Sequence, residues 1–338
     1  MRGRTNGPTI VEVARRSGVS TTTVSRYLNA SGPVNRVTAQ KIKSVIAELN
    51  YRPSLFAKGM RTNTSRTIGI LIPDYRNMFY PELFQGIDEY SREHGYMTLV
   101  TNTDVRSATE LDHIEDLIER HVDGLILFSY NRIKKDMDYL VTLSKQIPVV
   151  VMDPLIKNEP LSYVVSDGCK GTASGVSFLL GRGRKRIGYV RGPNSVFVTK
   201  ERFRGYKAAL ASHGIQFDPD LVVSGDFSVA SGFRAGKSLM EGTKKVDAIM
   251  TVNDMMAVGV MKYLHSVGLR IPEDVNVVGF DNIALCEIVE PSLTTIAQPI
   301  NELGRTAAEI VVQRNAERGV VKRQVVLDTT LIARDSTS

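Results

Sequence analysis

Acidic and amide side chains recur along the chain just after short apolar runs rich in valine and isoleucine. Asp74, Asp153, Asn253 and Asp281 each follow such a run, and Asp254 stands beside Asn253. Ligands of parallel-sheet proteins bind beyond the carboxyl ends of strands, where carboxylate and amide oxygens can accept hydrogen bonds from hydroxyl groups. The pattern predicts a cleft for a hydroxyl-bearing small molecule. Taken singly, these residues have simpler interpretations, with Asp254 as a helix cap and Asp281 as a turn residue.

A second group of polar side chains lies near the N-terminus. Thr21, Thr22, Ser25 and Arg26 fall at the start of a short predicted helix and one turn after it. In a helix-turn-helix protein these positions reach base edges in the major groove of DNA. Arg26 is the candidate for a bidentate contact with guanine, worth about 1–3 kcal/mol of discrimination, and the short threonines could contact thymine methyl groups. An ordinary helical hairpin is the alternative interpretation.

Three short helices are predicted to position these DNA-reading residues. Thr9 and Glu12 have the spacing of a capping box for the first helix, Gly18 can take the positive φ of a turn, and Ser20 can cap a second helix over residues 21–28. Asn35 is the expected cap of a third helix over residues 36–49. The apolar residues of that helix that we expect to bury against the first two are Val37, Ile42, Val45, Ile46 and Leu49.

The rest of the chain alternates short apolar runs with helical stretches. The strand-like runs cover residues 68–72, 97–101, 124–128, 149–152, 186–190, 248–252 and 275–280, and a last run covers residues 324–333. Such alternation predicts parallel sheets covered by helices on both faces. The length of this body suits two lobes.

The net charge of +7 is unevenly distributed. The first 66 residues hold twelve Lys or Arg against two acidic residues, whereas the remainder holds 31 basic and 34 acidic residues. A basic end on a slightly acidic body indicates a polyanionic partner for that end. A solvated basic tail is the alternative, but the helical pattern argues against it.

Several classes of protein are disfavoured by the sequence. The start lacks the apolar core of a secretory signal, no apolar run approaches a membrane span, and two cysteines in 338 residues suit a reducing compartment, so we expect a cytoplasmic protein. No nucleophile, zinc-protease or phosphate-loop motif occurs, and five scattered histidines lack metal-ligand spacing. We therefore expect no catalytic residues, no metal and no cofactor. The two competing hypotheses are an enzyme and a sugar-binding transport protein.

Two N-terminal segments carry a family resemblance: residues 9–29 (TIVEVARRSGVSTTTVSRYLN) and 47–54 (AELNYRPS). They closely resemble the lactose-repressor (LacI/GalR) family of bacterial transcriptional regulators. The resemblance continues through residues 68–74, 202–206, 253–254, 278–281 and 293–296, and so covers nearly the whole chain. It implies an all-α helix-turn-helix headpiece joined to an α/β two-lobed domain with doubly wound parallel sheets, like that of periplasmic sugar-binding proteins.

The resemblance also implies domain boundaries. The headpiece would take residues 1–52, the hinge helix or linker 53–66, and the effector-binding and dimerisation domain 67–338. Lobe 1 would comprise about 67–166 and 299–325, and lobe 2 about 167–298 and 326–338.

The function that the resemblance implies is that of a repressor. A homodimer would bind a pseudo-palindromic operator in double-stranded DNA and would be switched by a small-molecule effector, namely a sugar, sugar acid or sugar phosphate, with a purine as the alternative. Because the chain ends without a leucine heptad, we expect a dimer rather than a tetramer. Whether the effector releases or tightens DNA stays open.

Matching the family's motifs residue by residue gives two sets of site residues. The expected effector-binding residues are Phe79, Asp153, Arg202, Phe227, Asn253 and Asp281, together with Asp74. The expected DNA-binding residues are Thr9, Ser20, Thr21, Thr22, Ser25, Arg26, Asn29, Asn35, Ala57 and Met60. Met60, next to Gly59, would be the apolar wedge of a hinge helix that folds on DNA. The simpler interpretations are a core phenylalanine at position 79 and a plain linker over residues 53–65.

Overall fold

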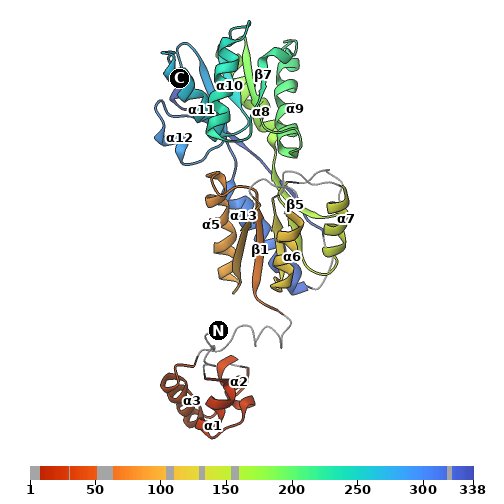
Figure 1. Ribbon diagram of the computed structural model, residues 1–338, viewed down its shortest axis with the longest axis vertical. Coiled ribbons are helices and arrows are strands. Elements are labelled where there is room, and N and C mark those ends of the chain that lie inside the picture. Colours follow the sequence, from red (N-terminus) through yellow and green to blue (C-terminus); the bar gives the residue numbers. More distant parts are fainter. Residues whose placement is uncertain are drawn as a thin grey trace, which may run out of the picture. The chain divides into compact units, whose positions relative to one another are not determined.

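The computed structural model describes residues 8–29, 31–51, 64–103, 110–128, 134–153, 160–317 and 322–338. The chain forms two compact units, Met1–Ser65 and Arg66–Ser338 (Figure 1). Each unit has its own hydrophobic core.

The first unit contains the helices α1 (Ile10–Ser17), α2 (Thr21–Asn29) and α3 (Arg36–Glu48). Their common core consists of Val13, Ala14, Val24, Ile42 and Val45. The prediction that Val37 is buried is wrong, because this side chain is 77% exposed. Val37 precedes Ile42 by five residues, and at 3.6 residues per turn that spacing puts it on the far side of α3.

Lobe 1 of the second unit is built on a six-stranded parallel sheet. Its strand order is β11-β5-β4-β3-β1-β2, with bounds Gln324–Leu327, Ser162–Ser166, Val149–Val151, Gly124–Leu127, Thr67–Ile72 and Met97–Asn102. Helices α5 (Phe79–Glu93) and α13 (Ile300–Glu317) cover one face, and α6 (Glu110–Glu119) and α7 (Lys134–Leu143) cover the other (Figure 1). The strands are buried on both faces, which explains their unbroken apolar sequence.

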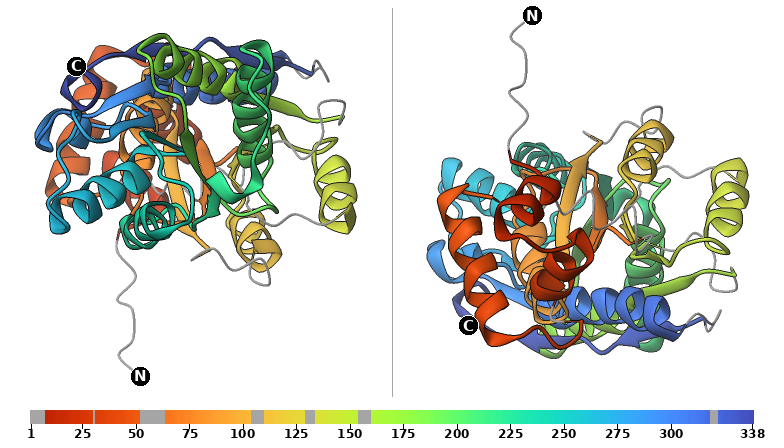
Figure 2. Two further views of the ribbon diagram at one scale, coloured as in Figure 1. Left: turned by 90° about the horizontal axis from the view of Figure 1, so that it is seen from above. Right: turned by 90° about the horizontal axis from the view of Figure 1, so that it is seen from below.

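Lobe 2 repeats this architecture. Its strand order is β12-β10-β9-β8-β6-β7, with bounds Thr330–Ile332, Thr294–Ala297, Asn276–Asp281, Ala248–Thr251, Ile187–Arg191 and Val222–Ser224, and only β12 is antiparallel. Helices α8 (Gly168–Gly181) and α9 (Phe197–Ser212) cover one face, and α10 (Val229–Glu241) and α11 (Asp254–Ser266) cover the other (Figure 2). The short α12 (Leu285–Ile288) follows β9.

The chain crosses between the lobes three times: after β5, after β10, and between β11 and β12. The third crossing lies at Asp328 and Thr329, two residues beyond the boundary expected after Val325, because β11 stays paired with β5 as far as Leu327. The expected single run over residues 324–333 is therefore two strands in different lobes. Among the described residues, no helix is long and apolar enough to cross a membrane.

Candidate functional site

One face of α2 carries the candidate DNA-reading side chains. Thr21, Thr22, Arg26 and Asn29 are exposed and Ser25 is half-buried, and their spacing places them on adjoining positions of one helical face. The side-chain amide of Asn29 donates to the Ser25 carbonyl oxygen at 2.9 Å. The exposed Arg26 guanidinium beside small hydroxyl groups is a surface that can enter a major groove.

The other candidates in this unit are helix caps. Ser20 Oγ accepts from the Thr23 amide at 3.2 Å, and Asn35 Oδ1 accepts from the Val37 amide at 2.9 Å. Thr9 Oγ1 accepts from the Glu12 amide at 3.3 Å. These caps fix where each helix starts.

Only half of the expected capping box forms. The Glu12 carboxylate pairs with Arg15 and Arg16, at 2.9 and 3.2 Å, instead of returning to the Thr9 amide. Two of the expected DNA contacts, Ala57 and Met60, lie outside the described residues.

In the second unit, a cavity of about 70 Å³ lies between the lobes. It collects six of the seven expected effector-binding residues from the ends of strands and starts of helices in both lobes. Its lining comprises Asn77, Phe79, Tyr80, Phe128, Met152, Asp153, Val164, Val165, Ser166, Val198, Arg202, Phe227, Asn253, Asp281, Gln298 and Leu303. The seventh expected residue, Asp74, is not among them, and its carboxylate pairs with Arg76 at 2.8 Å.

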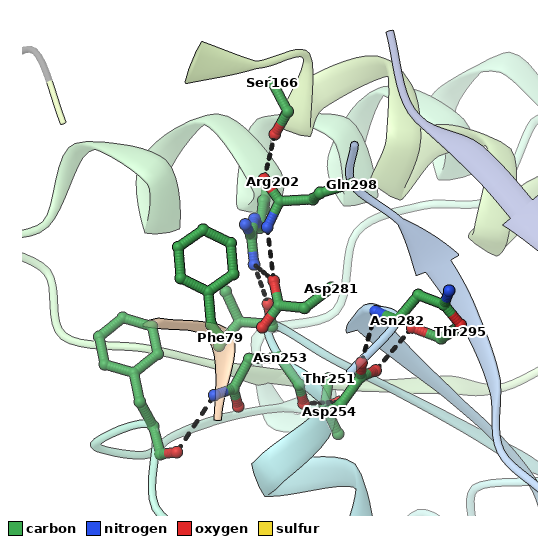
Figure 3. Close-up of polar contacts among 12 residues, drawn as sticks. Phe79, Ser166, Arg202, Thr251, Asn253, Asp254, Asp281, Asn282, Thr295 and Gln298 are labelled. Atoms are coloured by element: carbon green, nitrogen blue, oxygen red, sulfur yellow. Dashed lines mark hydrogen bonds and ion pairs between the residues drawn. The ribbon is translucent and has the colours of Figure 1, made fainter. Parts of the chain in front are cut away.

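A buried ion pair forms the polar centre of this cavity (Figure 3). Arg202 Nη1 donates to Asp281 Oδ1 at 3.3 Å and to the Val252 carbonyl oxygen, and the two side chains are 7% and 6% exposed. The guanidinium lies 3.7 Å from the centroid of the Phe280 ring. Removing either partner would leave an uncompensated buried charge, so both side chains are needed to keep this region stable.

The pair continues into the crossings between the lobes. Gln298 Nε2 donates to Asp281 Oδ1 at 2.6 Å, and the Ser166 hydroxyl donates to Gln298 Oε1 (Figure 3). Ser166 ends β5 and Gln298 follows β10, so both stand where the chain changes lobe. The sequence analysis missed these two residues. Their position after apolar runs that it did not assign as strands was the available signal.

The Asp281 carboxyl group has an unusual environment. Burial raises its pKa to about 7, although Arg202 opposes the shift, and the nearby Asp254 carboxylate adds to it. The Asp281 backbone has a φ of 126°, which side-chain-bearing residues rarely adopt. Strained, titratable residues of this kind cluster at functional sites.

Asn253 rather than Asp254 caps α11. Asn253 Oδ1 accepts from the Met256 amide at 3.1 Å. Its Nδ2 donates to the Phe227 carbonyl oxygen, and Figure 3 marks this second bond. The suggestion that Asp254 is a helix cap is therefore wrong. Its buried carboxylate accepts from the Asn282 amide at 2.6 Å and from Thr295 Oγ1 at 2.6 Å, so it anchors the loop that follows Asp281.

Two residues of lobe 1 contact lobe 2 across the cavity. Asp153 Oδ1 accepts from the Val198 amide at the start of α9 at 3.3 Å. Phe79 packs against the cores of both lobes, and its ring meets that of Phe128 edge-on at 6.4 Å. Phe79 therefore packs as a core residue and also lines the cavity, and its role in effector binding stays a prediction.

Comparison with family models identifies both units. Residues 9–54 match the model of bacterial regulatory proteins of the lacI family, and residues 176–337 match a periplasmic binding protein-like domain. The ribose operon repressor of Halalkalibacterium halodurans is 33% identical over 97% of each chain. The chain belongs to the lacI family. The HTH-type transcriptional repressor PurR of Vibrio atlanticus is 32% identical over 97% of this chain and 98% of its own.

Solved structures agree with this assignment. The Lac repressor dimer bound to operator and the anti-inducer ONPF matches 98% of this chain and 99% of its own, with a TM-score of 0.89 and 28% identity. A LacI family regulator from Enterococcus faecium with bound ribose matches 80% of this chain and 98% of its own, with a TM-score of 0.72 and 28% identity. This lacI-family member is a DNA-binding transcriptional repressor regulated by a small-molecule effector, and its relatives are regulators rather than enzymes.

Proposed function

We propose that the effector of this repressor is a monosaccharide bound in the cavity between the lobes. The convergence of Asp153, Arg202 and Asp281 on one small buried cavity carries the proposal. The two carboxylates accept from sugar hydroxyls and the guanidinium donates to ring and hydroxyl oxygens. The aromatic rings of Phe79 and Phe227 suit the apolar faces of a sugar ring.

The size of the cavity favours one sugar ring. The cavity has a volume of about 70 Å³. One water needs about 10–15 Å³ of such space, so the cavity holds roughly five to seven waters. A pentose or hexose displaces about that many, whereas a disaccharide would need a larger space or separated lobes. The resemblance to a ribose operon repressor and to a regulator with bound ribose makes a pentose the first compound to test.

We propose further that a homodimer binds a pseudo-palindromic operator. In each headpiece, Thr21, Thr22, Ser25 and Arg26 on α2 would read one half-site in the major groove, with Met60 as a wedge at the centre. Support comes from the net positive charge of the first 66 residues and from the Lac repressor dimer with operator, which this chain resembles.

Switching would act through the contacts that join the lobes. A sugar that binds Asp153 of lobe 1 and Arg202 or Asp281 of lobe 2 stabilises one lobe arrangement over another, and Gln298 transmits the change to a crossing. A near-complete switch requires a preference of about 10⁴-fold, or roughly 5.5 kcal/mol, for one arrangement.

Calorimetric titration of the full chain tests the effector assignment. D-ribose and other monosaccharides should bind, and Asp153→Ala should abolish the heat because it removes an acceptor from the cavity. Asp74→Ala is the matched control, since this carboxylate also follows a lobe 1 strand but lies outside the cavity. Binding of a purine base and of no monosaccharide would refute the proposal, as would equal loss of binding in both variants.

A further inference from the structure

A second cavity, of about 250 Å³, lies beside the crossings between the lobes. It is formed by residues of β5 and β11 in lobe 1 and by the N-terminal halves of α8 and α9 in lobe 2. We call it the crossover cavity. Its wall shares four residues with the 70 Å³ cavity proposed to bind the sugar, which we call the monosaccharide cavity. These residues are Val165, Ser166, Val198 and Arg202. A molecule bound there would touch both lobes.

The crossover cavity contains hydrogen-bond donors without partners. Tyr163 is only 8% exposed and lines this cavity, yet its hydroxyl has no hydrogen bond to any described residue. Arg202 Nε likewise lacks a partner among the described residues. Buried polar groups normally have a partner, so Arg202 Nε and the Tyr163 hydroxyl are the donors that a ligand in this cavity could satisfy.

The N-terminus of α8 forms part of the same wall. This helix has 14 residues and begins at Gly168, and a Cβ atom at that position would lie 2.9 Å from Arg202 Cγ and 3.5 Å from Arg202 Nε. The absence of a side chain at Gly168 therefore lets the Arg202 side chain lie directly against the first turn of α8. The helix N-terminus carries a partial positive charge, which adds to that of the guanidinium.

The acidic groups of the crossover cavity already have partners. Asp167 Oδ1 accepts from the Lys170 amide at 2.9 Å, and Glu201 pairs with Arg204 at 2.6 Å. The lining cations are paired as well, Lys170 with Asp328 at 2.8 Å, Arg202 with Asp281 at 3.3 Å and Arg204 with Glu201, so the lining carries no surplus positive charge. The groups without a partner among the described residues, the Tyr163 hydroxyl and Arg202 Nε, are donors, which favours a ligand that carries acceptor oxygens, such as a carboxylate or phosphate group.

We propose that the crossover cavity is a second ligand site for a small anion bearing a carboxylate or phosphate group. The anion would accept from Tyr163, Arg202 and the first amides of α8. By sharing Arg202 and Ser166 with the monosaccharide cavity, it alters the affinity for the sugar, and the sugar alters the affinity for the anion by the same factor. The site itself does not depend on the sugar assignment, but this coupling does.

Cys169 provides a reporter of occupancy in the full chain. Its half-buried thiol lines the crossover cavity and accepts a hydrogen bond from Arg204 Nε at 3.4 Å, whereas Cys286, the other thiol, is fully buried. Alkylation of Cys169 by iodoacetamide can be followed by mass spectrometry with inorganic phosphate, with pyruvate, or with sodium chloride at equal ionic strength. An anion at ten times its dissociation constant should slow the reaction about tenfold. Chloride should not.

Tyr163→Phe removes only the unpaired hydroxyl and should weaken this protection about tenfold, the value of one hydrogen bond to a charged group. Tyr96→Phe is the matched control, because Tyr96 is a buried lobe 1 tyrosine outside the cavity. No protection by either anion, or equal protection in Tyr163→Phe, would overturn the site. Protection that persists in Asp153→Ala would support it independently of sugar binding. Unchanged sugar affinity at a saturating anion concentration would refute the coupling.

Discussion

The Asp281→Asn substitution tests whether a buried, proton-binding carboxyl group lies at the centre of the monosaccharide cavity. Burial raises the pKa of Asp281 to about 7 from the ordinary 3.8, so between these values the folded chain holds a proton that the unfolded chain has lost. The stability that this proton gives is complete below pH 3.8 and disappears as the pH rises through 7. Asparagine cannot titrate and removes this pH dependence.

The size of the effect follows from the two pKa values. A difference of one bound proton changes the free energy of unfolding by about 1.4 kcal/mol per pH unit. Between pH 5 and pH 7, with the curve flattening near the folded pKa, the Asp281 contribution falls by about 2 kcal/mol. The wild-type chain should lose that much more stability than Asp281→Asn over this range.

Urea unfolding of the effector-free chain at pH 5, 6, 7 and 8, followed by circular dichroism, measures the difference. Asp74→Asn is the control for loss of a carboxylate. Although partial burial raises the pKa of Asp74, hydrogen bonds from Arg76 and its charge hold it below the ordinary value, so it does not titrate in this range. Parallel pH profiles for wild type and Asp281→Asn would show that Asp281 is ionised throughout, and the reasoning from burial would be wrong.

Three further predictions concern the DNA-reading face, the packing of lobe 1 and the hinge. Arg26→Ala should remove about 1–3 kcal/mol of discrimination at one operator position in gel-shift assays of operator variants, whereas the exposed Arg15→Ala on α1 should not; an unchanged preference would exclude Arg26 as a base reader. Gly86→Ala should destabilise the chain by about 1–3 kcal/mol in urea, because its new Cβ would lie 2.1 Å from a backbone oxygen of α13; Gly181→Ala, which meets nothing within 4 Å, should not. Met60→Ala should reduce DNA bending more than non-specific affinity, and equal losses would contradict a wedge.

The periodic parts of the fold could be predicted from the sequence. Strands buried on both faces give unbroken apolar runs, and helix caps have fixed side-chain chemistry. Strands β1 to β4, β6, β8 and β9 and the starts of α1, α2 and α3 were therefore identified, whereas β5, β7 and β10 were missed. The run over residues 324–333 was assigned as one strand because apolar periodicity does not show which sheet a residue joins. Strand β5 was missed because its sequence, SYVVS, is short and ends in polar residues that belong to the site.

The candidate site was predictable wherever a residue follows a recognised strand. Asp153, Asn253 and Asp281 met this condition and line the cavity. Asp74 also follows a recognised strand, but its carboxylate pairs with Arg76 outside the cavity. The sequence does not show which strand ends point toward the second lobe. Gln298 was missed because the run before it, β10, was not assigned as a strand. Tyr163 could not be found, since its importance depends on its place in a cavity wall.

Ser166 and Gln298, which the sequence analysis missed, connect the wall of both cavities to the crossings between the lobes. Asp281 ends β9, Gln298 follows β10, and Ser166 ends β5, so the hydrogen bonds that hold the ion pair pass directly through two of the three crossings. A ligand that displaces Arg202 would therefore strain these bonds or move a crossing. Because a packed core resists continuous deformation, the proposed switch would require a change between discrete lobe arrangements. The polar chain from Ser166 to Arg202 is thus the element through which we propose that a ligand in either cavity acts on the domain.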